Sequence, residues 1–253
     1  MIRAELLKLR RSMVWVFVPI LPLLAVISGG VNYWMNSGTL TNGWDSMTSQ
    51  VTLFYGMLFY SIGVAMVTAA VWRPEHRSST WNVALTSGHS RLALVLTKAA
   101  VILVPVAAIQ ATLVVMTWAF GKVVGLEGAL PLSFVVNAAL VVVASVPLVL
   151  LQSLLSMLFK SFAAPVAVCL GLSIIAFGAT AGSGSSSLAK AVSLVLPQAF
   201  VTQAMYAGST AVGAVAEAAL SNVGPLIGAI VVTTAVLTGL TALVTRSRTV
   251  FAH

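Results

Sequence analysis

The sequence predicts an all-α membrane protein, a single transmembrane domain over residues 1–253 that crosses the bilayer six times. Hydrophobic residues make up 59% of the chain and charged residues only 7%, whereas a soluble domain carries about 25% charged residues. The apolar stretches continue for about 18 residues or more, which is the length of a membrane-spanning helix. Strands of a membrane barrel would instead alternate apolar and polar residues over about ten positions.

The apolar stretches define the positions of the six spans. The first follows Arg10 and Arg11, and we expect it to be an uncleaved span rather than a signal peptide. The third and fourth exceed the ~20 residues that a bilayer requires, so we expect them to tilt or protrude. Ser90 is placed to cap the third span. The expected spans are residues 13–31, 51–72, 92–120, 132–159, 162–181 and 223–245.

The distribution of basic residues predicts the orientation. Of the 13 Lys and Arg residues, only Lys122 and Lys190 fall on one side of these spans. Cytoplasmic loops carry an excess of Lys and Arg, so the other side is expected to be cytoplasmic, with both termini, in the plasma membrane. Its basic residues are Arg3, Lys8, Arg10, Arg11, Arg73, Arg77, Arg91, Lys98, Lys160, Arg246 and Arg248.

Residues 1–12 have the pattern of a short amphipathic helix. Ile2, Leu6, Leu9 and Met13 are spaced 4, 3 and 4 apart, so they share one helical face. The basic residues off that face can contact anionic lipid head groups at the inner interface. The alternative is a plain cluster of topogenic charge. The residues assigned to the interfacial helix are Arg3, Lys8, Arg10 and Arg11.

The loop over residues 73–91 is the most polar cytoplasmic stretch. Ser79 or Thr80 can cap a short helix that ends at Leu85. We expect this helix to lie across the cytoplasmic end of the bundle and to carry Trp81.

The segment over residues 182–222 is expected to be extracellular. It contains two apolar pieces, residues 188–196 and 198–207, separated by Pro197. Each is too short to span a bilayer, so we expect a pair of short helices that enter the outer leaflet and pack on the bundle. The rival interpretation is a seventh span over residues 211–220.

Catalytic chemistry is not evident in the sequence. No zinc-protease motif, nucleophile elbow or paired catalytic carboxylates occur, and no phosphate-binding loop precedes a lysine. The chain is therefore expected not to be an enzyme and to bind no cofactor. The polar residues within spans, such as Gln110, Asn137 and Gln152, are neutral and suit interhelical hydrogen bonds. An ion-coupled carrier is disfavoured, because carriers commonly place ionisable residues inside the membrane.

The net charge of +8 does not indicate nucleic-acid binding, because the basic residues flank apolar stretches. Cys169 is the single cysteine and lies inside an apolar stretch. It has no disulfide partner in the chain and no metal-ligand spacing, so we expect it to fill the core.

The layout resembles the permease subunits of ABC-2 type ATP-binding cassette exporters. The shared features are an amphipathic N-terminal helix, six spans, a helix-bearing loop after the second span and short outer helices before the last. The residues from Glu75 to Leu85, followed by Ser90, Arg91 and Lys98, are similar to a pattern in permeases for lantibiotic immunity and bacitracin resistance. Ser79 stands where that pattern has glycine.

The resemblance implies partners and a site. A separate cytoplasmic ATPase would bind ATP and Mg, and a second permease copy, identical or related, and membrane lipids would complete the assembly. The substrate would be an amphipathic peptide, drug or lipid-like molecule moved outward. The residues assigned to ATPase coupling are Glu75, Arg77, Thr80, Trp81, Leu85 and Arg91. In that role Trp81 fills a groove on the ATPase.

The sequence leaves open both the role of Glu75 and the role of the whole chain. Glu75 can pair with the ATPase, with a neighbouring arginine, or with both. The chain can also be a membrane anchor or signalling protein that recruits a soluble partner through the same loop.

Overall fold

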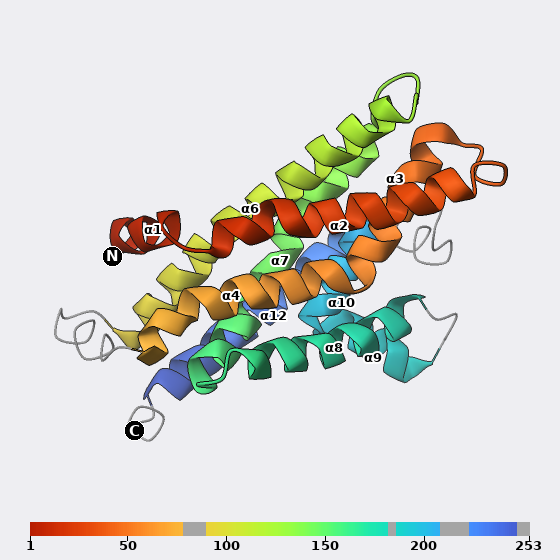
Figure 1. Cartoon of the computed structure of the whole chain (residues 1–253). Coiled ribbons are helices and arrows are strands. Elements are labelled where there is room, and N and C mark those ends of the chain that lie inside the picture. Colours follow the sequence, from red (N-terminus) through yellow and green to blue (C-terminus); the bar gives the residue numbers. More distant parts are fainter. Residues whose placement is uncertain (78–89, 182–185, 208–222, 247–253) are drawn as a thin grey trace.

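The computed structural model describes residues 1–77, 90–181, 186–207 and 223–246, and every regular element in these ranges is helical (Figure 1). The helices are α1 (Ile2–Arg10), α2 (Val14–Met35), α3 (Gly43–Phe54), the π-helix η1 (Tyr55–Phe59), α4 (Tyr60–Arg77), α6 (Arg91–Val123), α7 (Leu132–Leu158), α8 (Ala163–Ala181), α9 (Ser187–Val195), α10 (Pro197–Tyr206) and α12 (Val223–Arg246). The prediction of an all-α polytopic membrane protein is confirmed.

Five of these helices are long and apolar enough to cross a membrane: α2, α6, α7, α8 and α12. Two bent helix pairs pass the same test together, so the described residues allow up to seven spans. The pair α3–α4 bends by 48° at η1, and Figure 1 shows it running from one end of the bundle to the other. The pair α9–α10 bends by 94°. Six spans result if α3–α4 is one broken span and α9–α10 is re-entrant.

The second span begins earlier than the sequence predicts. Helix α3 starts at Gly43, whereas the apolar stretch begins only at residue 51. The added residues are mostly polar, but Trp44 and Met47 are buried, and Trp44 donates its indole hydrogen to the backbone oxygen of Glu127 at 2.8 Å. Packing against the α6–α7 connection therefore extends the helix beyond its apolar part.

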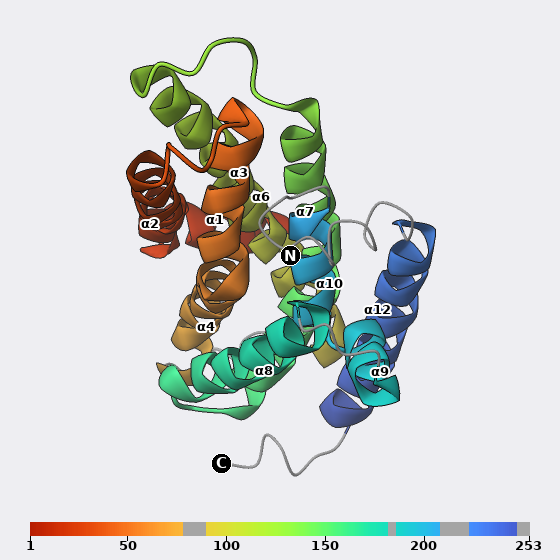
Figure 2. The same ribbon diagram turned by 90° about the vertical axis from the view of Figure 1, so that its right-hand side faces the viewer.

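The two short helices α9 and α10 agree in position with the predicted pair. Pro197 is the first residue of α10, where its missing N–H leaves no intrahelical bond unmade. Viewed from the end opposite α1, Figure 2 shows α2 on one flank of the bundle and α12 on the other. Both α9 and α10 lie toward this end (Figure 1). The alternative seventh span over residues 211–220 lies outside the described residues.

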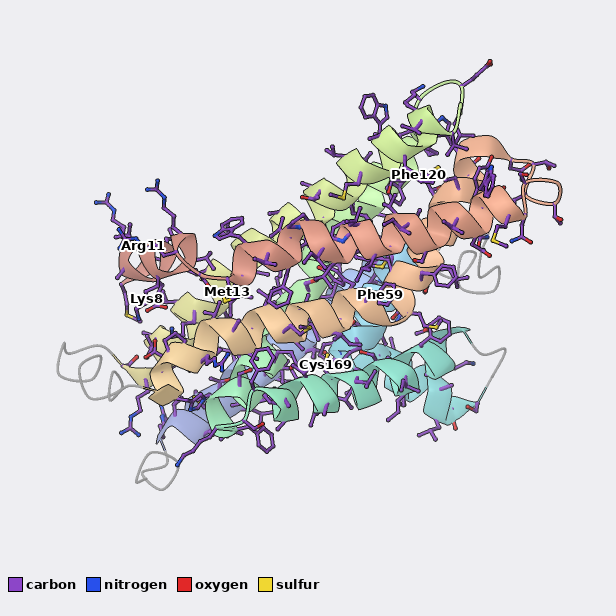
Figure 3. The ribbon with its side chains drawn as sticks, viewed as in Figure 1. Lys8, Arg11, Met13, Phe59, Phe120 and Cys169 are labelled. Carbon is purple, nitrogen blue, oxygen red and sulfur yellow. The ribbon has the colours of Figure 1, made fainter. Side chains whose placement is uncertain are left out.

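Close helix contacts depend on small residues. A Cβ added at Gly29 of α2 would lie 2.4 Å from the Cα of Val51 in α3, so only glycine permits this approach. Deeper in the bundle, the hydroxyl groups of Tyr60 and Ser145 are 2.7 Å apart and link α4 to α7. Cys169 of α8 is buried, as expected, and its thiol donates to the backbone oxygen of Ser61 at 3.3 Å (Figure 3).

The two ends of the bundle match the two predicted groups of loops. Helix α1, the last turn of α4, the first turn of α6 and the C-terminal end of α12 lie at one end (Figure 1). The α2–α3 and α6–α7 connections lie at the other end. The chain therefore brings its N-terminal helix and its last described helical turn to the same end of the bundle.

Candidate functional site

Four charged side chains meet at the end of the bundle that carries α1. Lys98 of α6 donates to Glu5 of α1 at 2.7 Å and lies 2.8 Å from the carboxylate of Glu75 in α4. Lys8 of α1 donates to Glu5 at 2.7 Å and to Glu75 at 3.2 Å. Each carboxylate thus contacts both ammonium groups, and we call these four residues the charge ring. It joins three helices that are far apart in the sequence.

The charge ring is mostly removed from solvent. Glu5, Glu75 and Lys98 are buried, while half of the Lys8 side chain is exposed. The Lys98 ammonium also lies 5.6 Å from the centre of the Trp72 ring, close enough for a cation–π contact. A buried charge is costly unless opposite charges and hydrogen bonds compensate it. Two positive and two negative groups in mutual contact provide that compensation.

The contacts of Lys8 also fix its protonation state. Burial lowers the pKa of the Lys8 ammonium, but its contacts with Glu5 and Glu75 outweigh this effect, and the pKa is raised above its ordinary value. Lys8 therefore keeps its charge at neutral pH, and the net charge of the ring is zero when both carboxylates are ionised. Figure 3 shows Lys8 in α1, next to the first turn of α2.

The sequence places Glu75 in the polar loop over residues 73–91, but in the structure it lies in α4, which continues to Arg77. Glu75 is only 3% exposed, because α1 and α6 cover it and bring two lysines to its carboxylate. The sequence singled out Lys98 only as part of a family pattern, and it did not single out Glu5. Acidic residues on an amphipathic helix are normally solvated. Only the tertiary contact between α1 and α6 distinguishes Glu5 from such solvated acidic residues.

The other predicted coupling residues are only partly described. Arg77 is the last residue of α4, and Arg91 is the first residue of α6. Ser90 caps α6 by accepting from the Ala93 N–H at 3.1 Å, as the sequence predicts. Outside the described residues lie Thr80, Trp81 and Leu85. Their role at an ATPase stays a prediction.

The basic residues of α1 and Arg11, which follows it, divide into two groups. Arg3, Arg10 and Arg11 are exposed, whereas Lys8 belongs to the charge ring. The predicted apolar face is incomplete, because α1 ends at Arg10 and Met13 starts the next helix as its N-cap. Leu9 is buried against the bundle and Ile2 and Leu6 are exposed, as a helix on a lipid surface requires. The place of α1 at the inner interface stays a prediction.

The described residues hold no group of three His, Cys, Asp or Glu side chains that could bind a metal ion. What they define is a helical membrane protein with a neutral ring of charges between its N-terminal helix and the flanks of a polar loop.

Residues 1–177 match the family model described as ABC-2 family transporter protein. The match covers more than half of the chain and includes all four residues of the charge ring, so the chain belongs to this family. It is a membrane permease subunit of an ABC transporter, a class that works with an ABC ATPase. Searches of curated proteins and of solved structures found no match.

Proposed function

We propose that this permease moves an amphipathic substrate outward, using ATP hydrolysis on a separate cytoplasmic ATPase. The substrate class is an antimicrobial peptide, a drug or a lipid-like molecule, and a second permease copy, identical or related, completes the transport path. The charge ring carries the proposal. It fastens α1 to the helices on both sides of residues 78–89, which contain the predicted ATPase contact.

The charge ring can transmit a displacement from one helix to another. Glu75 lies two residues before the last residue of α4, and Lys98 lies in the second turn of α6. A push by the ATPase on the intervening segment would move both helix ends, and their shared contact with Glu5 would move α1 with them. Packed helices pass such displacements as rigid bodies. The interfacial helix would then shift along with the spans that line the path.

A pull-down with the ATPase separates binding from coupling. We expect Trp81→Ala to weaken ATPase binding about thirtyfold, which is the effect of losing an aromatic hot spot. The double variant Glu75→Gln/Lys98→Met should keep ATPase binding, because its residues are buried inside the permease. It should nevertheless move less substrate per ATP hydrolysed, measured as uptake of a fluorescent amphipathic probe from the medium into inside-out vesicles.

The control is Trp34→Ala, since Trp34 is an exposed tryptophan at the opposite end of the bundle. It should change neither ATPase binding nor the transport ratio. The proposal fails if Trp81→Ala binds the ATPase as the native chain does, or if the double variant transports with the native ratio. Gel filtration of each variant confirms that the permease is folded.

Labelling tests the orientation. Ser161 and Ser37 are exposed and lie in the α7–α8 and α2–α3 connections, at opposite ends of the bundle. In a Cys169→Ser background, an impermeant maleimide added to intact cells should label Ser37→Cys and leave Ser161→Cys unlabelled. The reverse result would place α1 and the charge ring outside the cytoplasm and remove the ATPase from its predicted contact.

A further inference from the structure

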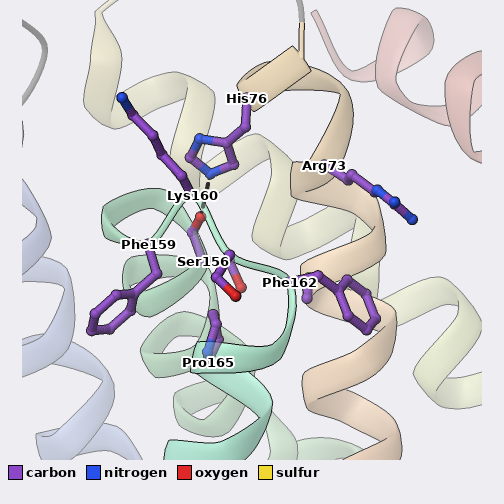
Figure 4. Close-up of a pocket in the computed structure, with 9 residues that line it drawn as sticks. Arg73, His76, Ser156, Phe159, Lys160, Phe162 and Pro165 are labelled. Atoms are coloured by element: carbon purple, nitrogen blue, oxygen red, sulfur yellow. Dashed lines mark hydrogen bonds between the residues drawn. The ribbon is translucent and has the colours of Figure 1, made fainter. Parts of the chain in front are cut away.

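A cavity of about 260 Å³ opens at the same end of the bundle as the charge ring. It lies between the last turn of α4, the end of α7 and the start of α8, and Figure 4 shows its lining. Its lining residues are Ala69, Arg73, His76, Ser156, Phe159, Lys160, Ser161, Phe162 and Pro165. No carboxylate is among them, in contrast to the charge ring.

The cavity carries positive charge that the described part of the chain does not neutralise. Arg73 and Lys160 are exposed, and neither forms an ion pair with a described carboxylate. The Arg73 guanidinium lies 6.0 Å from the centre of the Phe162 ring. Figure 4 shows His76 between the Arg73 and Lys160 side chains, which extend to either side of the cavity. Both side chains are long and can turn toward a shared anion.

One polar group in the cavity wall lacks a partner. Ser156 is only 2% exposed, and its hydroxyl has no hydrogen-bond partner, although buried hydroxyls are normally paired. The backbone oxygen of the same residue is paired with Nε2 of His76 at 2.6 Å, so the wall itself is well ordered by hydrogen bonding. The first turn of α8 also borders the cavity at Pro165, but it adds few donors, because proline has no N–H and the Ala163 N–H donates to the Ser161 hydroxyl at 3.2 Å.

The rim of the cavity is apolar. Phe159 and Phe162 line it, and Phe159 and its neighbour Leu158 are 41% and 43% exposed. Basic pockets between helices at the inner membrane surface suit phosphate-bearing head groups, whose acyl chains stay in the bilayer. Cations, an unpaired hydroxyl and an apolar rim together fit such a ligand.

We propose that this cavity binds a phosphate group, held by Arg73, Lys160 and the Ser156 hydroxyl, and that an anionic phospholipid of the inner leaflet supplies it. This goes beyond substrate export, because a lipid there sits against the last turn of α4, which also carries Glu75 of the charge ring. It ties the position of the α4 end to the lipid composition of the membrane. Free inorganic phosphate is the other source with the same chemistry.

Native mass spectrometry of the purified full-length chain in detergent tests the site. Phosphatidylglycerol, phosphatidylcholine and inorganic phosphate are added separately, and the bound fraction is followed with concentration. Phosphatidylglycerol is expected to bind more tightly than phosphatidylcholine. Lys160→Gln and Arg73→Gln should each weaken its binding about fivefold, as the loss of one charge at a lipid surface implies. Ser156→Ala should weaken it less.

The matched control is Lys190→Gln, which removes one exposed lysine from α9 at the other end of the bundle and should leave binding unchanged. Gel filtration shows whether each variant is folded. Binding of phosphatidylglycerol that Lys160→Gln reduces assigns the site to a lipid. Binding of inorganic phosphate alone, reduced by the same variant, assigns it to a soluble phosphate. If neither binds, or if Lys160→Gln and Lys190→Gln behave alike, the proposal is overturned.

Discussion

The two ends of the bundle hold their helices together by different physical means. At the α1 end, Glu5, Glu75 and Lys98 meet as buried charges. At the opposite end, a glycine contact joins α2 to α3, and Trp44 makes an indole-to-backbone hydrogen bond and a cation–π contact with Lys122, so no buried ion pair takes part in these contacts. Charge contacts can be broken and remade by a nearby charge, whereas close backbone packing allows little adjustment. The comparison indicates that the helices at the α1 end can rearrange when a nearby charge changes, whereas the helices at the other end keep their relative positions.

The largest expected effect is at the charge ring. Lys98→Met leaves two buried carboxylates with only half-exposed Lys8 between them, so we expect a loss of about 3–5 kcal/mol in the free energy of unfolding. Thermal unfolding in detergent, followed by tryptophan fluorescence, measures it. Lys190→Met, at an exposed site, should have almost no effect.

A double variant tests the ring more sharply. Lys98→Met/Glu75→Gln removes one charge of each sign and leaves the Glu5–Lys8 pair at 2.7 Å. We expect it to be more stable than Lys98→Met alone, because no buried carboxylate then lacks a cation. If the losses in the free energy of unfolding from Lys98→Met and Glu75→Gln simply add in the double variant, the four charged groups stabilise the protein independently. The charge ring would then not be an energetically coupled group.

Much of the fold follows from the sequence, because lipid demands long apolar helices and the chain supplies them. The short helices on either side of Pro197 were also predicted within a residue or two, since their length and the proline limit them. The ring was not predicted. The contact between Glu5 and Lys98 joins residues 93 positions apart, and no local pattern distinguishes a buried carboxylate on an amphipathic helix from a solvated one.

An intermediate effect is expected at the other end, at Gly29. Gly29→Ala would put a Cβ 2.4 Å from the Cα of Val51, so α2 and α3 must move apart, at a cost of about 1–3 kcal/mol. Gly171→Ala in α8 is the matched control, because an added Cβ there meets nothing within 4 Å. The Gly171→Ala variant should have a melting temperature equal to or slightly above that of the native chain, because alanine stabilises a helix more than glycine does. Equal melting temperatures for the two variants would contradict the tight α2–α3 contact.

The smallest expected effect is at Trp44, which makes one neutral hydrogen bond and whose ring lies 5.7 Å from the Lys122 ammonium, a contact that a phenyl ring can also make. Trp44→Phe keeps an aromatic ring in the same buried site but removes the indole N–H that donates to the backbone oxygen of Glu127. One neutral hydrogen bond contributes about 1 kcal/mol, so the loss should be about that size, well below the loss at Lys98. Thermal unfolding monitored by circular dichroism measures it without relying on the altered tryptophan.

Trp34→Phe is the control for this change, because Trp34 is 66% exposed and no hydrogen bond of its indole occurs among the described residues. Its melting temperature should match that of the native chain. A Trp44→Phe loss as large as that of Lys98→Met would mean that the α2–α3 end also depends on one polar contact. The contrast between an end joined by buried ion pairs and an end joined by close packing would then fail.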